Sequence, residues 1–307
     1  MTNATRRYLC AAGLFVLGYG HLAPAAEDGE HAKPSMPTTV STFESIGIYW
    51  KAGPDAPGGK CAVRYRAKGA GEWREALPLW FDKRNGQYRG SIMLLKPGTA
   101  YEIGLRPEGV DAWTAVSART WSEDFPIERT VTLAPGTRSK PLVITEGGKP
   151  GAFVLYTVQP GETTTIDVAN KHACCVEIKA SRVIVRGLTL KGAREDGIKL
   201  GKVKDVVIER CDISGWGRQD PCGFGTWFDS GIKATWPGLK RIVVQRNRIH
   251  HPRYDSNNWT EKGFYTKQPY HPFGPQAISW MNNRGNHVIR YNEFYSDNDH
   301  RFTDAIG

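Results

Sequence analysis

Several charged residues recur in short strand-like segments of the chain and could carry acid–base chemistry. Glu177, Lys199 and Lys233 alternate with apolar positions, as does Ser279, so all four are expected to point outward from one surface. Two neighbouring lysines repel one another, which lowers a lysine pKa and favours a general base. A base of this kind could remove the proton α to a uronate carboxyl group. The alternative is a solvated basic face that pairs with nearby acids.

Carboxylates stand at the entrances to the same segments. Asp196, Asp229 and Asp304 each come one or two residues before a Gly or Ala, so they could form a column. Hydrolysis of a glycosidic bond needs one protonated and one ionised carboxyl group about 5 to 9 Å apart. A lyase with Lys199 or Lys233 as base and a hydrolase with two of these aspartates are both open. For any single aspartate, a purely local role in a turn is the alternative.

The stretches between these segments are rich in aromatic residues. Flat rings with polar edges suit pyranose sugars, although long loops that pack on one another would use the same rings. The candidate substrate-binding residues are Glu177, Ser279, Trp227, Trp259 and His250. No cofactor is expected, because the one alternative, Ca²⁺ bound by Asp297, Asp299 and His300, matches no full calcium loop.

Length and composition describe a folded protein with mostly β structure. The 307 residues are 40% hydrophobic and 23% charged, and 34 Gly and 19 Pro are scattered along the chain, which favours short strands joined by turns. The net charge of +10 suggests an affinity for polyanions. The basic residues are dispersed rather than clustered, so an acidic polysaccharide is expected as partner and nucleic acid is not.

The N-terminus predicts export. Arg6 and Arg7 precede an apolar run over residues 8–22 that ends in the small-residue site Ala23-Pro24-Ala25. Residues 1–25 are therefore expected to be a cleaved signal peptide and residues 26–35 a linker, which makes the protein secreted or periplasmic. No later apolar run is long enough to span a bilayer, so no membrane span is expected.

Residues 36–122 show the rhythm of a β-sandwich, with alternating apolar positions and turns about every ten residues. The stretch LKPGTAYEIGL at 95–105 resembles the E to F corner of a fibronectin type III domain, in which the hydroxyl of a buried Tyr, here Tyr101, ties the corner to upstream backbone. Residues 48–50 and 63–66 are similar to strands B and C of that family. The resemblance implies a spacer or adhesive module. Residues 36–122 also contain aromatic side chains that could stack on sugars or pack internally, namely Trp80, Phe81, Trp113 and Trp121.

From residue 143 onward a different pattern repeats, in which a short strand is followed by a strand, a tight turn and another strand. The best-aligned copies begin at residues 183, 206, 242 and 287. Three short strands cannot bury a face alone and are stabilised by stacking on the next repeat. The pattern resembles the right-handed parallel β-helix of the pectin lyase superfamily, over residues 125–307. Asn247 and Asn292 match the internal Asn ladder of that fold, with Gly187 and Cys211 in the equivalent places of earlier coils.

The resemblance implies a substrate groove over the first strand of each coil, between loops at 215–230, 250–276 and 296–305. We therefore expect an exported carbohydrate-active enzyme, a lyase or glycoside hydrolase that acts on an acidic polysaccharide. The alternative is a non-catalytic glycan-binding or surface-attached protein. The chain stops at Gly307 in what reads as the opening strand of a further coil, so a truncated C-terminus is also expected.

Overall fold

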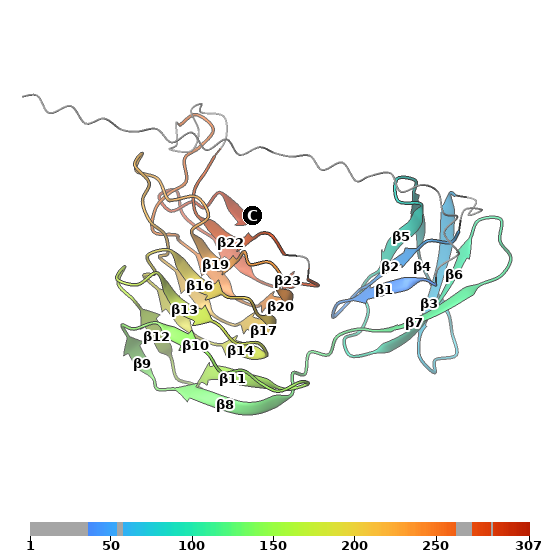
Figure 1. Ribbon diagram of the computed structural model, residues 1–307, viewed down its shortest axis with the longest axis horizontal. Coiled ribbons are helices and arrows are strands. Elements are labelled where there is room, and N and C mark those ends of the chain that lie inside the picture. Colours follow the sequence, from blue (N-terminus) through green and yellow to red (C-terminus); the bar gives the residue numbers. More distant parts are fainter. Residues whose placement is uncertain (1–35, 54–57, 262–271, 284) are drawn as a thin grey trace, which may run out of the picture.

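The computed structural model describes residues 36–53, 58–261, 272–283 and 285–307, and the predicted signal peptide and linker lie outside these ranges. Every regular element of the described residues is a β-strand, which confirms the all-β prediction (Figure 1). In these ranges no long apolar helix of the kind that crosses a membrane is present.

The N-terminal part forms a seven-stranded, sandwich-like antiparallel sheet in the order β1-β2-β5-β4-β3-β6-β7. Its inward residues, such as Ile48, Tyr88 and Ile103, are almost fully buried. The Tyr101 hydroxyl accepts a hydrogen bond from the backbone N–H of Lys96 at 2.9 Å, as the corner motif predicts. The strands are β1 (Thr38–Ser41), β2 (Ile46–Trp50), β3 (Lys60–Ala67), β4 (Arg74–Asp82), β5 (Gln87–Ile92), β6 (Ala100–Pro107) and β7 (Thr114–Arg119).

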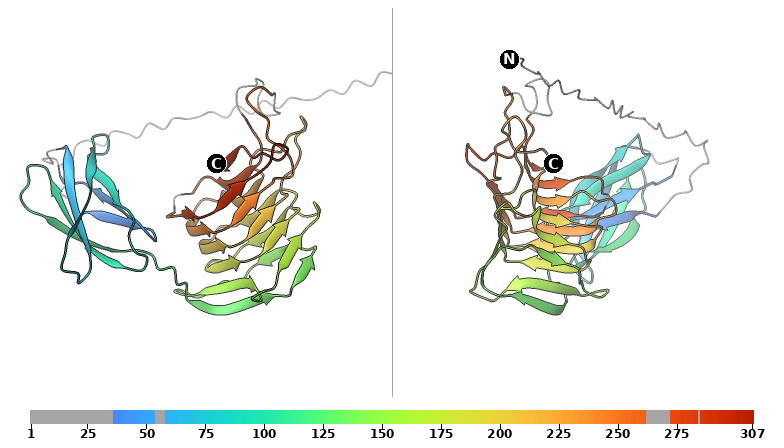
Figure 2. Two further views of the ribbon diagram at one scale, coloured as in Figure 1. Left: turned by 180° about the vertical axis from the view of Figure 1, so that it is seen from behind. Right: turned by 60° about the vertical axis from the view of Figure 1, so that its left-hand side comes forward.

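The rest of the chain winds through three parallel sheets of six strands each, and every turn of the chain adds one strand to each sheet (Figures 1 and 2). The first parallel sheet contains β10 (Leu142–Ile144), β13 (Cys174–Ile178), β16 (Asp196–Leu200), β19 (Ser230–Ala234), β22 (Gln276–Trp280) and β25 (Asp304–Ile306). The second contains β8 (Ile127–Leu133), β11 (Phe153–Val158), β14 (Val183–Arg186), β17 (Lys204–Glu209), β20 (Lys240–Gln245) and β23 (Val288–Arg290). The third contains β9 (Gly136–Arg138), β12 (Thr164–Asp167), β15 (Thr189–Lys191), β18 (Asp212–Ser214), β21 (Arg248–His250) and β24 (Glu293–Tyr295).

One continuous apolar core runs through the coils. Within a single coil Ile198, Ile208 and Ile213 come from the three sheets, and each is fully buried in the same cluster. The strands are only three to seven residues long in these sheets, so a coil exposes its apolar face until the next coil covers it. Stacking therefore supplies the burial that no coil achieves alone.

Two asparagines cap the turns between the second and third sheets from inside. Asn247 Nδ2 donates to the carbonyl of Ile208 and to Asn292 Oδ1, both at 2.9 Å, and its Oδ1 accepts from the Cys211 N–H at 3.0 Å. Asn292 repeats the pattern toward the Val244 carbonyl at 2.9 Å. The predicted inward ladder of Asn247 and Asn292 is confirmed.

The prediction that Gly187 occupies a ladder position is wrong by one residue. Strand pairing aligns Arg186 with Glu209, so Leu188 takes the place of Cys211. Gly187 instead aligns with Arg210, and both residues have a positive φ, of 74° and 53°. The glycine marks the left-handed residue just before the ladder, where a residue without a side chain is least strained.

The sandwich-like sheet contacts the outer face of the second parallel sheet. Leu155, Ile184, Val207 and Val243 form an apolar row there that packs against Phe43, which is only 1% exposed. The Arg290 guanidinium lies 3.7 Å from the centre of the Phe43 ring. This apolar contact joins the loop before β2 to the parallel sheets.

A ladder of polar side chains runs across the same face. Arg186 Nε donates to Glu209 at 2.6 Å, Gln245 donates to Glu209 at 2.5 Å, and Arg290 Nε donates to Gln245 at 2.8 Å. Arg290 also donates to Glu123, in the segment between the two parts of the chain, at 2.6 Å. We call these five residues the polar ladder. These bonds join side chains of successive coils and of the linking segment, so most polar atoms of the polar ladder have a partner, whereas the buried Nη1 of Arg290 has none among the described residues.

Candidate functional site

The outward row predicted from the sequence exists on the first parallel sheet. Glu177 pairs with Lys199, Lys199 with Lys233, and Lys233 with Ser279 in successive strands. The first three side chains are partly exposed, but Ser279 is fully buried. The prediction of Ser279 as an accessible floor residue is therefore wrong, because packing closes the row at this end.

A second row lies at the start of the same strands. Asp196 and Ser230 lie at equivalent positions of β16 and β19, and Ser230 pairs with Gln276 and Gln276 with Asp304. The sequence predicted Asp229 in one column with Asp196 and Asp304. In the structure Ser230 occupies that position, and Asp229 lies one residue before it. Asp304 is exposed, and its carboxylate accepts a hydrogen bond from Gln276 Nε2 at 3.4 Å. Among the described residues, no hydrogen bond links Asp304 to Asp196 or Asp229.

Glycines follow two members of this second row. A Cβ on Gly197 would lie 2.6 Å from a methyl group of Ile213, and one on Gly231 would lie 2.7 Å from a methyl group of Ile249. Both glycines therefore face the core, where no side chain fits. Ile198 and Ile232, the next residues, are buried in the core as well, so the strict alternation of the strand is interrupted at these glycines. Asp196, just before Gly197, lies 4.0 Å from Nζ of the outward Lys233.

Four side chains form what we call the charge cluster: Asp196, Asp229 and Lys233, and Arg218 from the loop between β18 and β19. Asp229 is 2% exposed and accepts from Arg218 three times, from the backbone N at 2.8 Å, Nε at 3.0 Å and Nη2 at 2.6 Å. Asp196 accepts from the Ser230 N–H at 3.0 Å and lies 4.0 Å from Lys233 Nζ. Lys233 also donates to the carbonyl of Phe228.

The environment of the charge cluster leaves one carboxyl group about half protonated at neutral pH. Burial raises the pKa of Asp196 to about 7, assisted by repulsion from Asp229 and opposed by attraction to Lys233. Burial also raises the pKa of Asp229, whereas the Arg218 hydrogen bonds act in the opposite direction. A proton donor and a carboxylate clamped by a guanidinium therefore share one site.

Arg218 is the member of this cluster that sequence reasoning missed. It lies in the loop between β18 and β19 and binds Asp229, eleven positions later in the chain. A buried aspartate needs a cation or several donors, but the chain has 41 Lys and Arg residues from which to choose. The course of the loop between β18 and β19 decides that Arg218 is the cation that binds Asp229.

The aromatic loop residues pack largely on one another. Trp227 stacks on Phe228 with ring centres 3.8 Å apart and meets Phe273 edge-on at 4.5 Å. Trp259, by contrast, is 64% exposed. Part of the loop that carries Trp259, residues 262–271, lies outside the described ranges. Trp227 therefore stiffens the loop beside Phe228.

His250 belongs to a different cluster on the third parallel sheet. Its Nε2 lies 3.0 Å from Asp212, its Nδ1 lies 2.7 Å from His251 Nδ1, and its ring stacks on Tyr295 at 4.6 Å. The structure thus does not bring His250 together with the lysine row. His300 contacts Asp297 at 2.8 Å, but among the described residues no group of three or more His, Cys, Asp or Glu side chains is placed to hold a metal ion.

Comparisons with known proteins found matches among solved structures. No family model and no curated protein matches the sequence. Among solved structures, the chain is similar to the fibronectin type III domain of human contactin 1, at 15% identity over 38% of this chain and 98% of that one, with a TM-score of 0.24. The fourth fibronectin type III domain of a human protein matches at 16% identity over 36% of this chain and 98% of that one, with a TM-score of 0.23. A computationally redesigned β-sandwich protein matches at 18% identity over 30% and 91%, with a TM-score of 0.24.

Proposed function

We propose that β8 to β25 form a right-handed parallel β-helix of the pectin lyase type behind a fibronectin type III-like sandwich. Three parallel sheets with one strand per coil support this architecture. The internal hydrogen bonds of Asn247 and Asn292 support it further, because they cap stacked turns.

On this scaffold we infer an exported enzyme that hydrolyses an acidic polysaccharide. The observation that carries the proposal is the buried carboxyl group of Asp196, whose pKa of about 7 keeps a proton available at neutral pH. Lys199 and Lys233 lie beside it in register and would bind the acidic groups of the sugar. A polymer would reach the site past Arg218 and Lys233, whose side chains are 47% and 20% exposed.

The proposed roles follow from the hydrogen bonds of each group. Asp196 would give its proton to the glycosidic oxygen as the bond to the anomeric carbon breaks. Asp229, whose pKa burial raises against the opposing hydrogen bonds of Arg218, would accept a proton from the attacking water. Lys233 donates to the Phe228 carbonyl, which supports a cationic binding role over that of a base. A lyase with Lys199 as base is the second candidate, favoured only by the adjacency of the two lysines.

The test separates hydrolase, lyase and binding protein. The full-length chain is incubated with polygalacturonate, alginate and neutral dextran while reducing ends and the ultraviolet absorbance of unsaturated uronates are followed. Reducing ends without the absorbance are expected, with turnover that falls as the pH rises through about 7. Both signals together would indicate a lyase, and binding without either signal would overturn the enzyme proposal.

Variants of the carboxylates complete this test. Asp196→Asn keeps the shape of the side chain but removes its proton, so turnover should fall roughly 10² to 10⁴-fold. Asp212→Asn, a half-buried position on the third sheet, is the matched control and should retain turnover. Equal activity of the two variants would place the site elsewhere.

A further inference from the structure

Four cations lie in one row on the outer face of the sandwich-like sheet. Along β3, Cys61 and Val63 point into the core, so Lys60, Arg64 and Arg66 point outward. Arg106 of β6 pairs with Ala62 and fills the gap in this row. We call Lys60, Arg106, Arg64 and Arg66 the cationic strip. Its members recur about every 6 to 7 Å, the rise of two strand residues.

The guanidinium groups of the strip are held by indole rings. Arg64 lies between Trp73 and Trp113, 4.5 and 4.1 Å from the ring centres. Arg66 lies 4.5 Å from Trp73, and Arg106 lies 4.6 Å from Trp113. Arg64 thus contacts two rings, and Arg66 and Arg106 contact one ring each. These cation–π contacts restrain the guanidinium groups, so a ligand would have little side-chain motion to freeze.

Gly104 makes room for this stack. A Cβ at that position would lie 3.1 Å from Arg64 Cγ and Nε and 3.1 Å from Trp113 Cε3. The small residue in the middle of β6 therefore lets the guanidinium and the indole lie flat on the sheet.

Most of the positive charge of the strip is not neutralised. Arg66 forms an ion pair with Glu102 at 2.6 Å. Within the described ranges, no carboxylate lies within the 4.0 Å ion-pair limit of Lys60, Arg64 or Arg106. Three cations in register thus present free charge along one strand direction.

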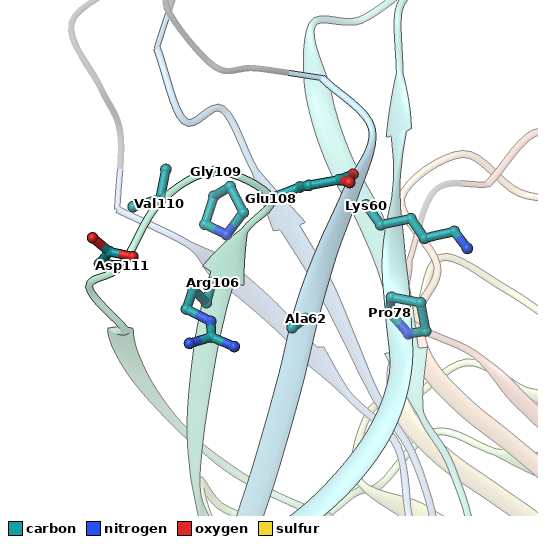
Figure 3. A pocket seen from close by; sticks show the side chains of 9 residues that line it. Lys60, Ala62, Pro78, Arg106, Glu108, Gly109, Val110 and Asp111 are labelled. Atoms are coloured by element: carbon teal, nitrogen blue, oxygen red, sulfur yellow. The ribbon is translucent and has the colours of Figure 1, made fainter.

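The strip runs into a hollow of about 570 Å³ at one end of the sheet (Figure 3). Ala62 and Arg106 from neighbouring strands line it, together with Lys60. Glu108 and Asp111, on the loop after β6, line it as well, so this end carries charge of both signs. The net positive part of the surface is the stretch from Arg106 to Arg66.

We infer that the cationic strip binds a linear acidic polysaccharide through its carboxylate or sulfate groups. The guanidinium fork matches such groups with two parallel hydrogen bonds. The indole faces within the stack are covered by guanidinium groups, so they are closed to base stacking, which single-stranded nucleic acid would use. The inference uses no residue of the charge cluster and does not depend on the proposed cleavage.

The test measures binding of the full-length protein to polygalacturonate, dextran sulfate, neutral dextran and poly(dT). Arg64→Gln with Arg106→Gln should weaken binding to the two acidic glycans at least about 10-fold, because two charge-assisted contacts are lost. The matched control, Lys171→Gln with Lys191→Gln, removes the same charge from exposed positions outside the sandwich-like sheet and should bind like the parent. Parent-like binding by the Arg64 and Arg106 variant would overturn the inference.

A variant that is expected to bind more tightly provides a second test, because unfolding of the protein could not produce that result. Glu102→Gln releases Arg66 from its ion pair and should tighten binding of the acidic glycans. Weaker or unchanged binding by this variant, equal binding of neutral dextran, or tighter binding of poly(dT) would each count against the inference. Asp196→Asn should bind like the parent even where it turns over no substrate, which separates this strip from the catalytic proposal.

Discussion

Asp196 shows how a single buried carboxyl group sets both a chemical role and a cost in stability. Its carboxyl binds a proton more tightly in the folded chain, with a pKa of about 7, than at the ordinary value of 3.8. The folded state therefore binds more protons than the unfolded state between these values. The contribution of Asp196 to the free energy of unfolding therefore falls as the pH rises from about 4 to about 7.

Asp196→Asn should abolish this pH-dependent fall in the free energy of unfolding. At pH 8 the variant should be more stable than the parent by on the order of a few kcal/mol, and at pH 4 the advantage should vanish. Urea unfolding at the two pH values measures the difference. Asp297→Asn provides the contrast, because the His300 hydrogen bond lowers the pKa of Asp297, so that variant should gain no stability at pH 8. A pH-independent difference for Asp196→Asn would contradict the raised pKa.

At the residue scale, the sequence predicted the register of the outward row but not how deeply its members are buried. Glu177, Lys199 and Lys233 follow from the alternation of a strand, which fixes the outward side. The burial of Ser279 depends on what packs over the strand, and the pairing of Arg218 with Asp229 depends on the course of a loop. Neither leaves a periodic signal in the sequence.

At the scale of the element, the turn between the second and third sheets is the clearest test of the fold. Asn247→Leu removes two donated hydrogen bonds and one accepted bond from a site that is 1% exposed. The Cys211 N–H and the Ile208 carbonyl then lose their partner, which should lower the free energy of unfolding by about 1 to 3 kcal/mol. Chemical unfolding measures this loss.

Asn292→Leu is the matched variant for that turn. Asn292 is less buried than Asn247, so its loss should cost less. A larger loss for Asn292→Leu than for Asn247→Leu would show that burial does not govern the ladder.

The repeated strands from residue 176 onward were predictable because apolar residues alternate in each of them. The one-residue error at Gly187 has a physical origin. The left-handed position before the ladder holds Gly187, Arg210, Arg246 and Tyr291, with φ between 53° and 74°. Three of these four residues are not glycine, so the turn is imposed by its hydrogen bonds and residue type alone misplaces it.

At the scale of the whole molecule, the contact around Phe43 couples the sandwich-like sheet to the parallel sheets. Phe43→Ala should cost about 3 to 5 kcal/mol, because a buried ring is removed and a cavity is left. We expect the variant to unfold in two transitions and to be cut faster by proteases in residues 120–126. Tyr49→Ala, at a 39% exposed position in the adjacent strand, should change neither. A single unchanged transition in Phe43→Ala would mean that this contact does not couple the two parts.

The spacing of the polar ladder has a mechanical consequence. Its successive bonds join residues 23, 36 and 45 positions apart. A force that pulls on the chain ends would peel the coils away one at a time, and each would release its own length of chain. At about 3.5 Å per extended residue these lengths are roughly 80, 125 and 160 Å. The force–extension trace of this protein would therefore record the order in which its coils detach, because no two of these steps are equally long.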